Sequence, residues 1–336
     1  MKIAAVIPCY GVRDRVGAVI AAMGPEVTRI FVVDDACPEK TGDHVEATIR
    51  DARVKVLRNA RNLGVGGAVK AGMRAALDEG ADILVKVDGD GQMDPALIPT
   101  LVRPIVEGRA DYAKGNRFFE LAGLSSMPGV RFFGNAMLSL VSKVSSGYWD
   151  IMDPTNGFVA IHAAVARRLP FERIADDYFF ESDLLFRLGT LRAVVADMPM
   201  AARYGGERSS LSVPRVVLRF PFRYANRFVK RIFYNYFLRD FNAGSVQIVL
   251  GVLLAGFGLA FGGWHWAESI RTGVPATSGT VMLAALPLLL GGHLLLSAIN
   301  YDVANVPRRP LHPLLGTGAG AGRLCEDSAH KEESPT

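Results

Sequence analysis

The sequence predicts an α/β domain with a mostly parallel sheet, followed by amphipathic juxtamembrane helices and two transmembrane helices. Short apolar runs alternate with helix-like stretches over the first two hundred of the 336 residues, a cadence typical of strand–helix–strand crossovers. Two later segments, 243–267 and 272–301, contain no Asp, Glu, Lys or Arg. Each is longer than the about 20 helical residues that cross about 30 Å of hydrocarbon.

The apolar runs in the first part of the chain are expected strands because each is short and mostly apolar. They are residues 3–7, 30–33, 54–57, 83–87 and 111–113. The stretches between them are expected to be helical at 16–23, 41–50, 67–79 and 95–106. Ligands of parallel sheets collect at the carboxyl ends of the strands. Polar clusters follow three of these strands, at 8–10, 34–35 and 88–90.

Composition narrows the class of protein. Half of the residues are hydrophobic and the mean hydropathy is positive, which is high for a purely soluble protein. Cys9, Cys37 and Cys325 have neither a paired nor a metal-ligand spacing, as expected in a reducing compartment. Residues 1–7 are too short for the apolar part of a signal peptide.

A basic, aromatic stretch at 214–241 precedes the first apolar segment, and it fits either nucleic acid or an anionic membrane surface. The apolar segments that follow favour the membrane and argue against nucleic acid. Arg and Lys residues before the first segment and after the second predict that both termini and the α/β domain are cytoplasmic. The small-residue spacing of 258–262 permits close helix approach, and with it self-association of the chain.

Residues 83–95 deliver two aspartates, Asp88 and Asp90, from an apolar strand into a glycine-containing turn. This arrangement suits an oxygen-rich site for a hard divalent cation that also binds a diphosphate. The alternative is an ordinary strand-to-helix turn, in which Asp and Gly are common.

Two further motifs could contact a nucleotide. Asp34 and Asp35 end a buried strand, where one could accept a hydrogen bond from a nucleobase or ribose, or could cap the next segment. Residues 59–72 form a glycine-rich entry into a helix that matches neither common phosphate-loop pattern. A nucleotide contact at the helix amino terminus and close packing of the helix on the sheet both explain these glycines.

These motifs, in this order, resemble family 2 inverting glycosyltransferases, and among them the polyprenyl-phosphate branch that contains dolichyl-phosphate mannose synthase. The resemblance is carried by residues 6–10, 32–35, 62–72 and 88–95 and extends to about residue 211. It implies an A-type glycosyltransferase nucleotide-binding fold. The pair Ala36-Cys37 departs from the Gly-Ser of many relatives, and the acidic pattern around 181–183 is looser, which puts a catalytic base there in doubt.

The resemblance also implies roles for individual residues. The nucleotide would be held by Pro8, Tyr10, Asp34, Asp35, Gly64, Lys70, Asp88 and Arg208. Mg²⁺ or Mn²⁺ would be ligated by Asp88, Asp90 and Gln92. The residues expected to act on the acceptor phosphate or the leaving diphosphate are Asp153, Arg117, Arg131 and Arg203. The acceptor, a phosphate monoester with a second pKa of about 6, needs little help from a general base. Asp153 could therefore orient Arg131, the sugar or the metal-site loop, in place of accepting a proton.

The resulting prediction is a bacterial-type inner-membrane enzyme that moves a sugar from a UDP- or GDP-linked donor to polyprenyl phosphate. Its expected parts are a cytoplasmic catalytic domain at 1–212, juxtamembrane helices at 213–242, two transmembrane helices at 243–302 and a disordered cytoplasmic tail at 303–336. Transfer to another lipid or glycan acceptor is the alternative activity. A membrane scaffold without catalysis is the alternative from another class.

Overall fold

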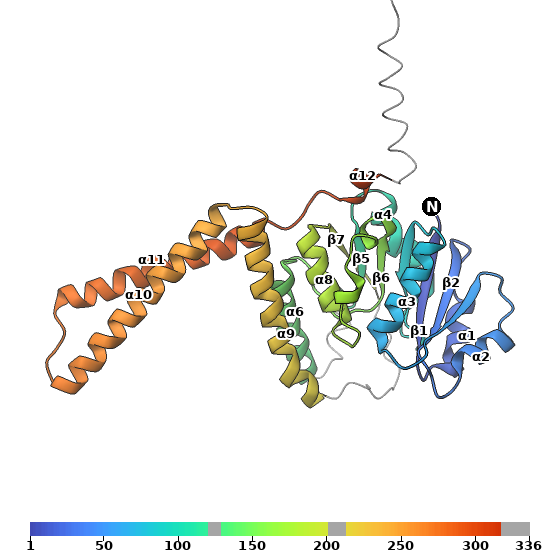
Figure 1. Cartoon of the computed structure of the whole chain (residues 1–336), viewed down its shortest axis with the longest axis horizontal. Coiled ribbons are helices and arrows are strands. Elements are labelled where there is room, and N and C mark those ends of the chain that lie inside the picture. The colour runs from blue at the N-terminus through green and yellow to red at the C-terminus, as the bar shows by residue number, and fades with distance from the viewer. Residues whose placement is uncertain (120–128, 201–212, 317–336) are drawn as a thin grey trace, which may run out of the picture. The chain divides into compact units, whose positions relative to one another are not determined.

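The computed structural model describes residues 1–119, 129–200 and 213–316 (Figure 1). Side chains at 129–133, 135 and 213–218 are outside this description. The chain divides into two units: residues 1–227 with the segment from 307 on, and residues 228–306. The first unit contains the sheet, and the second contains two long apolar helices.

The first unit is built on a seven-stranded sheet with the order β3-β2-β1-β4-β6-β5-β7. Pairing is parallel except on the two sides of β6, which runs against both β4 and β5. The sheet is therefore mostly parallel, as predicted. Its strands are β1 Ile3–Cys9, β2 Val27–Asp34, β3 Val54–Arg58, β4 Ile83–Lys86, β5 Tyr112–Asn116, β6 Val159–His162 and β7 Val195–Pro199.

Helices cover both faces of this sheet, which explains why β1 and β4 are apolar on consecutive positions. One face packs on α1 Arg13–Ala21, α2 Thr41–Thr48 and α4 Ile98–Val106, which follows the 3₁₀ turn Pro95–Leu97. The other face packs on α3 Val65–Asp78 and α8 Phe180–Leu191, with α6 Gly129–Ser146 against α8. The predicted strands and helices up to residue 113 are all present, with boundaries that differ by a few residues.

Two short elements lie between β6 and α8: α7 Ala163–Ala166 and the 3₁₀ turn Phe171–Arg173. After β7, the long helix α9 Val213–Phe233 leads out of the first unit. Within the first unit α9 contacts α8 through two polar pairs. Tyr224 shares a 2.7 Å hydrogen bond with Ser182, and the guanidinium of Arg227 donates to the buried carboxylate of Asp183 at 2.7 Å. The boundary between the two units thus falls inside α9. The division of the chain at residue 212 stays a prediction.

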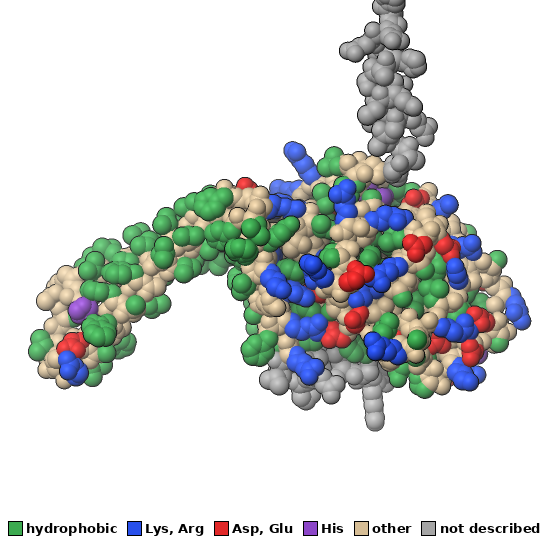
Figure 2. Space-filling model, viewed as in Figure 1, with side chains coloured by type: hydrophobic (Ala, Val, Ile, Leu, Met, Phe, Trp, Pro, Cys, Tyr) green, Lys and Arg blue, Asp and Glu red, His purple; other side chains and the backbone are tan. Residues whose placement is uncertain are grey.

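The second unit is a hairpin of α10 Ala243–Thr272 and α11 Ser278–Ala304, both long and apolar enough to cross a membrane. Hydrophobic side chains cover the hairpin (Figure 2). Gly273 has a left-handed φ of +70°, and Thr277 caps α11, so the connector is 273–277 and the second apolar helix begins later than predicted. A Cβ at Gly258 would collide with α11. This small residue therefore serves packing within the chain, and self-association through it stays a prediction.

An ion pair closes the base of the hairpin inside the second unit. After α9 the chain makes a π-helical turn, Tyr234–Leu238, before α10 begins. Arg231 is buried and donates to both carboxylate oxygens of Asp302, at 2.7 and 3.0 Å. The hydroxyl of Tyr236 donates to the same carboxylate at 2.6 Å. The end of α11 is thereby tied to the helical segment that precedes α10.

The segment after α11 returns to the first unit and binds at the amino end of β5. The buried carboxylate of Asp111 accepts hydrogen bonds from the backbone N–H groups of Val194, Leu311 and His312, each at 2.8 Å. The ring of His312 contacts Asp111 through Nδ1 at 2.8 Å and stacks on His162, with centroids 4.3 Å apart. Residues 312–315 form the short helix α12. The prediction of a disordered tail from 303 is therefore wrong for 303–316, and residues 317–336 lie outside the described residues.

Asp111→Asn should destabilise the first unit by about 2–3 kcal/mol, because an amide nitrogen would face backbone donors in a buried place. The melting temperature should fall by roughly 5–10 °C. Asp78→Asn, at an exposed position at the end of α3, is the matched control and should melt like the wild type. Limited proteolysis should also cut earlier near residues 307–316 in the Asp111 variant. Equal melting of the two variants would contradict this account of the segment.

Candidate active site

The strand ends bring most of the predicted residues to one edge of the sheet. β1, β2 and β4 are parallel, so Cys9, Asp34 and the turn after Lys86 finish at the same edge. β5 is antiparallel to β6 and β6 to β4, so β5 also ends there, with Arg117 one residue beyond it. The segment 153–158 enters β6 from the same side. This edge is the candidate active site.

The acidic turn after β4 holds its two aspartates in different ways. Oδ1 of Asp88 lies 2.7 Å from the ammonium of Lys86, a side chain that is only 1 % exposed. Asp90 is partly buried, and its Oδ1 accepts a hydrogen bond from the backbone N–H of Gln92 at 3.0 Å. Burial raises the pKa of Asp90, whereas Asp88 and Glu181 raise the pKa of Lys86 against the opposing effect of burial. Asp88 is thus charge-compensated within the protein.

The turn fits a divalent cation in its donor chemistry. Asp88 uses Oδ1 for Lys86, and within the described ranges no Lys or Arg forms an ion pair with Asp90. Oxygen atoms of both carboxylates therefore remain for a hard cation. The described part of the chain gathers no set of three or more His, Cys, Asp or Glu side chains. Two carboxylates completed by substrate phosphates are a usual protein contribution to a Mg²⁺ site.

The aspartates at the end of β2, Asp34 and Asp35, each accept hydrogen bonds from backbone N–H groups of the protein. The backbone N–H groups of Cys37 and Gly42 donate to Asp34 at 2.7 and 2.6 Å, so Asp34 fastens the start of α2. Asp35 accepts from the backbone N–H groups of Leu63 and Gly64, at 2.9 and 2.8 Å. Both carboxylates organise loops at this edge of the sheet, in agreement with the capping alternative. A nucleotide contact by either stays a prediction.

The glycine-rich entry into α3 is a tight packing site. Gly64 has a φ of +85°, and a Cβ there would collide with the carbonyl of Asp176. At Gly72 a Cβ would collide with Val6, so α3 approaches β1 closely. Lys70 is buried, with its ammonium 2.6 Å from Asp176 Oδ1 and 2.8 Å from the carbonyl of Ile174. Close packing thus explains the glycines, while Lys70 holds the 174–176 loop.

Some predicted site residues are exposed or partly buried at this edge, and others lie outside the described residues. The side chain of Tyr10 is exposed beyond the end of β1, and Pro8 is partly buried there. Gln92 is partly buried in the acidic turn. Arg203 and Arg208 lie outside the described residues, as does the side chain of Arg131 at the start of α6.

Asp153 and Arg117 form the strongest polar pair of the site. Asp153 is fully buried and accepts from Arg117 three times: from the backbone N–H at 3.2 Å, from Nε at 2.8 Å and from Nη2 at 3.0 Å. Asn156 also donates to this carboxylate at 3.2 Å. Although burial opposes ionisation, Arg117 holds the pKa of Asp153 below its ordinary value. This geometry makes Asp153 an orienting anion for Arg117 and a poor proton acceptor.

Lys86 is a buried charged residue of this region that the prediction missed, whereas Lys114, near Arg117 in sequence, resembles a position that neutralises the acceptor phosphate. Lys86 contacts Asp88 and Glu181, and Lys114 is fully buried on β5 with its pKa lowered by burial. A signal for Lys86 exists in the sequence, because a lysine in an apolar strand two positions before Asp88 shares its face and is rarely buried unpaired. The pairing of Glu181 with Lys86 agrees with the doubt about a base at 181–183.

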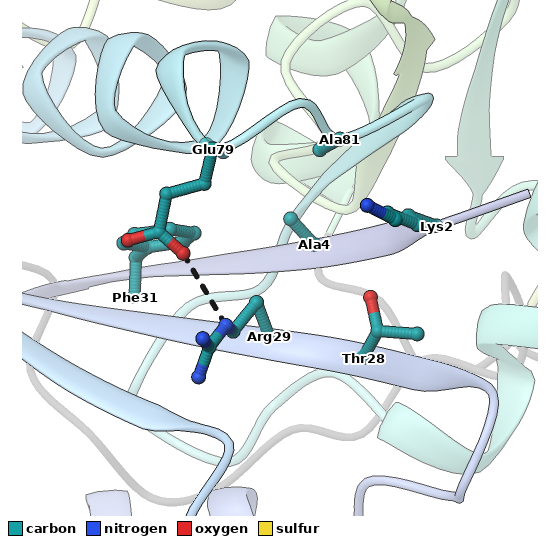
Figure 3. Close-up of a pocket in the computed structure, with 8 residues that line it drawn as sticks. Lys2, Ala4, Thr28, Arg29, Phe31, Glu79 and Ala81 are labelled. Carbon is teal, nitrogen blue, oxygen red and sulfur yellow. Dashed lines mark ion pairs between the residues drawn. The ribbon is translucent and has the colours of Figure 1, made fainter.

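The small pocket of Figure 3 lies at the opposite edge of the sheet. Lys2, Thr28 and Arg29 line it from the amino ends of β1 and β2, together with Glu79 after α3. Arg29 and Glu79 form an ion pair of 3.3 Å across it. Its volume of about 20 Å³ is room for about one water molecule. The pocket is therefore separate from the candidate active site.

Asp153 should not contribute to the pH dependence of activity near neutral pH, because its pKa is lowered. Its folded pKa lies below the ordinary value of about 3.9, so the Asp153–Arg117 pair contributes stability above about pH 4 and loses it as pH falls through the lower folded value. Between pH 5 and 8 Asp153 stays ionised. With donor and metal saturating, kcat/KM for a phosphate acceptor should rise with pH through one inflection near 6, the acceptor's own second pKa. An inflection that moved on substituting Asp153 would contradict this.

The chain is similar in sequence to known proteins. Glycosyl transferase family 2 matches residues 4–170. An undecaprenyl-phosphate mannosyltransferase of Micrococcus luteus is 29 % identical over 204 residues, which cover 60 % of this chain and 83 % of the relative. A dolichol-phosphate mannosyltransferase of Pyrococcus furiosus is 28 % identical, over 49 % of this chain and 47 % of the relative.

The fold is also found among solved structures. Glucosyl-3-phosphoglycerate synthase from Mycobacterium tuberculosis, in complex with Mg²⁺ and UDP, superposes with a TM-score of 0.52 at 18 % identity, over 68 % of this chain and 79 % of the other. The same enzyme with Mn²⁺, UDP and phosphoglyceric acid gives 0.51 at 18 % identity, over 68 % and 78 %. At this identity the likeness concerns the fold. The family match and the relatives show that the chain is an enzyme of glycosyl transferase family 2, in the polyprenyl-phosphate branch.

Proposed function

We propose that this enzyme transfers a sugar from a nucleotide sugar to polyprenyl phosphate, with inversion at the anomeric carbon. One observation carries the proposal: a single sheet edge combines an acidic turn suited to a metal diphosphate with an arginine that a buried aspartate orients. The relatives named for undecaprenyl-phosphate and dolichol-phosphate transfer support the choice of acceptor.

The donor side of the site would hold the nucleotide diphosphate. Asp88 and Asp90 would bind Mg²⁺ or Mn²⁺, with Gln92 beside them, and a cation bound there would supply positive charge where the leaving diphosphate becomes more negative. The complexes of the fold neighbours with Mg²⁺ or Mn²⁺ and UDP support this assignment. The loops organised by Asp34 and Asp35, next to Pro8 and Tyr10, would receive the nucleoside. A panel of donors would identify the nucleotide, UDP or GDP, and the sugar that the enzyme uses.

The acceptor side would bind and align the phosphate of the polyprenyl chain. An acceptor oxygen forms the bond to the anomeric carbon as the bond from that carbon to the diphosphate breaks, and the nucleoside diphosphate leaves. The acceptor is mostly a dianion at neutral pH, so no proton has to be removed by the enzyme. Arg117, fixed by Asp153, would neutralise the acceptor charge and hold it in line. Arg131, Arg203 and Arg208 would add positive charge on the acceptor and diphosphate.

The apolar hairpin would anchor the enzyme where its acceptor resides. Bringing a polyprenyl chain into water costs about 0.8 kcal/mol for each CH₂, so the reaction has to take place at the membrane surface. We assign α10 and α11 to the inner bacterial membrane as two spans, with residues 1–212, both termini and the segment after α11 in the cytoplasm. The basic residues of 213–242 would contact anionic headgroups.

A donor panel tests the proposal. Purified full-length protein in detergent would be incubated with undecaprenyl phosphate, Mg²⁺ or Mn²⁺, and UDP- or GDP-linked sugars one at a time. We expect one donor to yield a lipid heavier by one sugar residue, detected by mass spectrometry. Diacylglycerol replaces undecaprenyl phosphate in the matched control reaction. Product from diacylglycerol alone would favour the alternative acceptor, and no lipid product from any donor would contradict the proposal.

A further inference from the structure

Lys86 lies where three separate parts of the candidate active site meet. Its ammonium is 2.7 Å from Asp88 of the acidic turn, 3.1 Å from Glu181 of α8 and 3.3 Å from the carbonyl of Gly157, which precedes β6. The Lys86 side chain is 1 % exposed and the Glu181 side chain 10 % exposed. All three hydrogen-bond donors of the ammonium therefore have an oxygen partner, and the cluster is open to solvent mainly at Asp88, whose side chain is 30 % exposed.

The position of Gly157 makes this contact specific. A Cβ at residue 157 would collide with the ammonium of Lys86 and with Oδ2 of Asp88. Only a residue without a side chain lets the segment 153–158 lie against the Lys86–Asp88 pair. The same segment carries Asp153, which orients Arg117, and Asn156, which donates to Asp153. Lys86 thus contacts the donor-side turn and the acceptor-side segment at once.

The register of the strands places further polar side chains on the same face of the sheet as Lys86. Lys86 pairs with Val159 of β6, and Val159 pairs with Lys114 of β5, which in turn pairs with Asp197 of β7. The register places Lys86, Lys114 and Asp197 on one face of the sheet. Within the described ranges, Lys114 Nζ and Asp197 Oδ1 are buried without a hydrogen-bond partner. The negative charge of Asp153 acts on Lys114, so this layer adjoins the acceptor side.

We propose that Lys86 is a positioning residue that couples the two halves of the site, so that binding at the Asp88 turn changes the affinity for the acceptor phosphate at Arg117. A cation bound to the Asp88 carboxylate would weaken the ion pair between Asp88 and Lys86. The ammonium then bonds more strongly to the Gly157 carbonyl, its most distant partner, and tightens the segment that holds Asp153. The coupling is reciprocal by linkage, so acceptor binding strengthens nucleotide binding equally. This inference rests on the proposed function.

The test measures the coupling without turnover. Calorimetry on full-length protein in detergent would give the Kd of Mn²⁺ with UDP, and separately with GDP, in the presence and absence of undecaprenyl phosphate. These nucleotides carry no sugar, so no transfer takes place. In the wild type the acceptor should lower the nucleotide Kd at least about 5-fold. The double variant Lys86→Met/Glu181→Gln removes one cation and one anion together. Its ratio of the nucleotide Kd without acceptor to the Kd with acceptor should fall below about 2-fold.

Two single variants separate coupling from folding. Glu181→Gln keeps the contacts of Lys86 with Asp88 and Gly157 and should retain the wild-type ratio of Kd values. Gly157→Ala leaves every charge in place but displaces Lys86. Its ratio of Kd values should fall below about 2-fold, as in the double variant. Melting curves would establish that each variant is folded. A merely structural Lys86 would change the melting temperature and leave the ratio of Kd values unchanged.

The outcomes are distinct from those of the proposed function. Full coupling in the double variant and in Gly157→Ala would overturn the role of Lys86. A wild type that forms the lipid-linked sugar but shows no coupling would also overturn it, while the proposed function stands. A wild type that forms no lipid-linked sugar from any donor would remove the proposed function and this inference with it.

Discussion

Asp90→Asn is expected to lower sugar transfer by about 10²- to 10³-fold, the largest effect of any single substitution at this site. Asp90 forms no ion pair with a Lys or Arg in the described ranges, whereas Lys86 already compensates Asp88. Its carboxylate is thus the one most available to a cation, and an amide is a much weaker ligand for Mg²⁺. Raising the acceptor or the donor concentration should not restore most of the lost rate, because the missing charge acts on the leaving diphosphate.

The matched control for this substitution is Asp94→Asn, four residues further on. Asp94 accepts a hydrogen bond from the backbone N–H of Ala96 and caps the turn before α4. Asparagine caps about as well as aspartate, so this variant should keep nearly wild-type transfer. Initial rates of lipid product at several Mn²⁺ concentrations would compare the two. Transfer by Asp90→Asn at the wild-type rate would show that the turn does not bind the metal.

Asp153→Asn should lower both stability and acceptor use. Replacing a buried carboxylate that binds Arg117 three times leaves the guanidinium poorly oriented, and breaking such a pair costs about 3 kcal/mol. The melting temperature should drop by about 6–12 °C. With the arginine displaced, kcat/KM for the acceptor should fall about 10²-fold, mainly through a higher acceptor KM.

Arg117→Lys is the companion variant, because lysine keeps the charge but cannot reproduce the forked contact with Asp153. It should raise the acceptor KM as Asp153→Asn does, with a smaller loss of stability. A general base would behave differently. If Asp153 removed a proton, Asp153→Asn would lower kcat at an unchanged acceptor KM and would alter the pH profile, and that result would refute the orienting role.

The parallel half of the fold could be predicted from the sequence because its signals are local. β1 and the residues 30–33 of β2 and 83–85 of β4 are continuous apolar runs, and a strand buried on both faces needs no other pattern. The later strands are harder to recognise. β6 has only four residues, and its antiparallel place between β4 and β5 depends on contacts distant in sequence. The same holds for the segment at 311–312, which is ordered by Asp111, two hundred residues earlier.

The candidate site shows the same division. The expectation of parallel strands alone predicts that residues 8–10, 34–35 and 88–90 share an edge. The partners of those side chains could not be predicted, because they depend on packing between elements. Lys86 sits on a strand, yet its burial is decided by Glu181 of α8 and by the missing side chain of Gly157. Lys70 is similarly bound to Asp176, a residue of the loop before α8.

The central claim is that two carboxylates recruit a divalent cation so that a nucleotide diphosphate can leave beside a lipid phosphate. It is tested most directly by stripping purified protein with EDTA and measuring the undecaprenyl-linked sugar by mass, before and after Mg²⁺ or Mn²⁺ is restored. We expect product formation to fall to background and to return with the metal. Undiminished product under exhaustive chelation would contradict the claim.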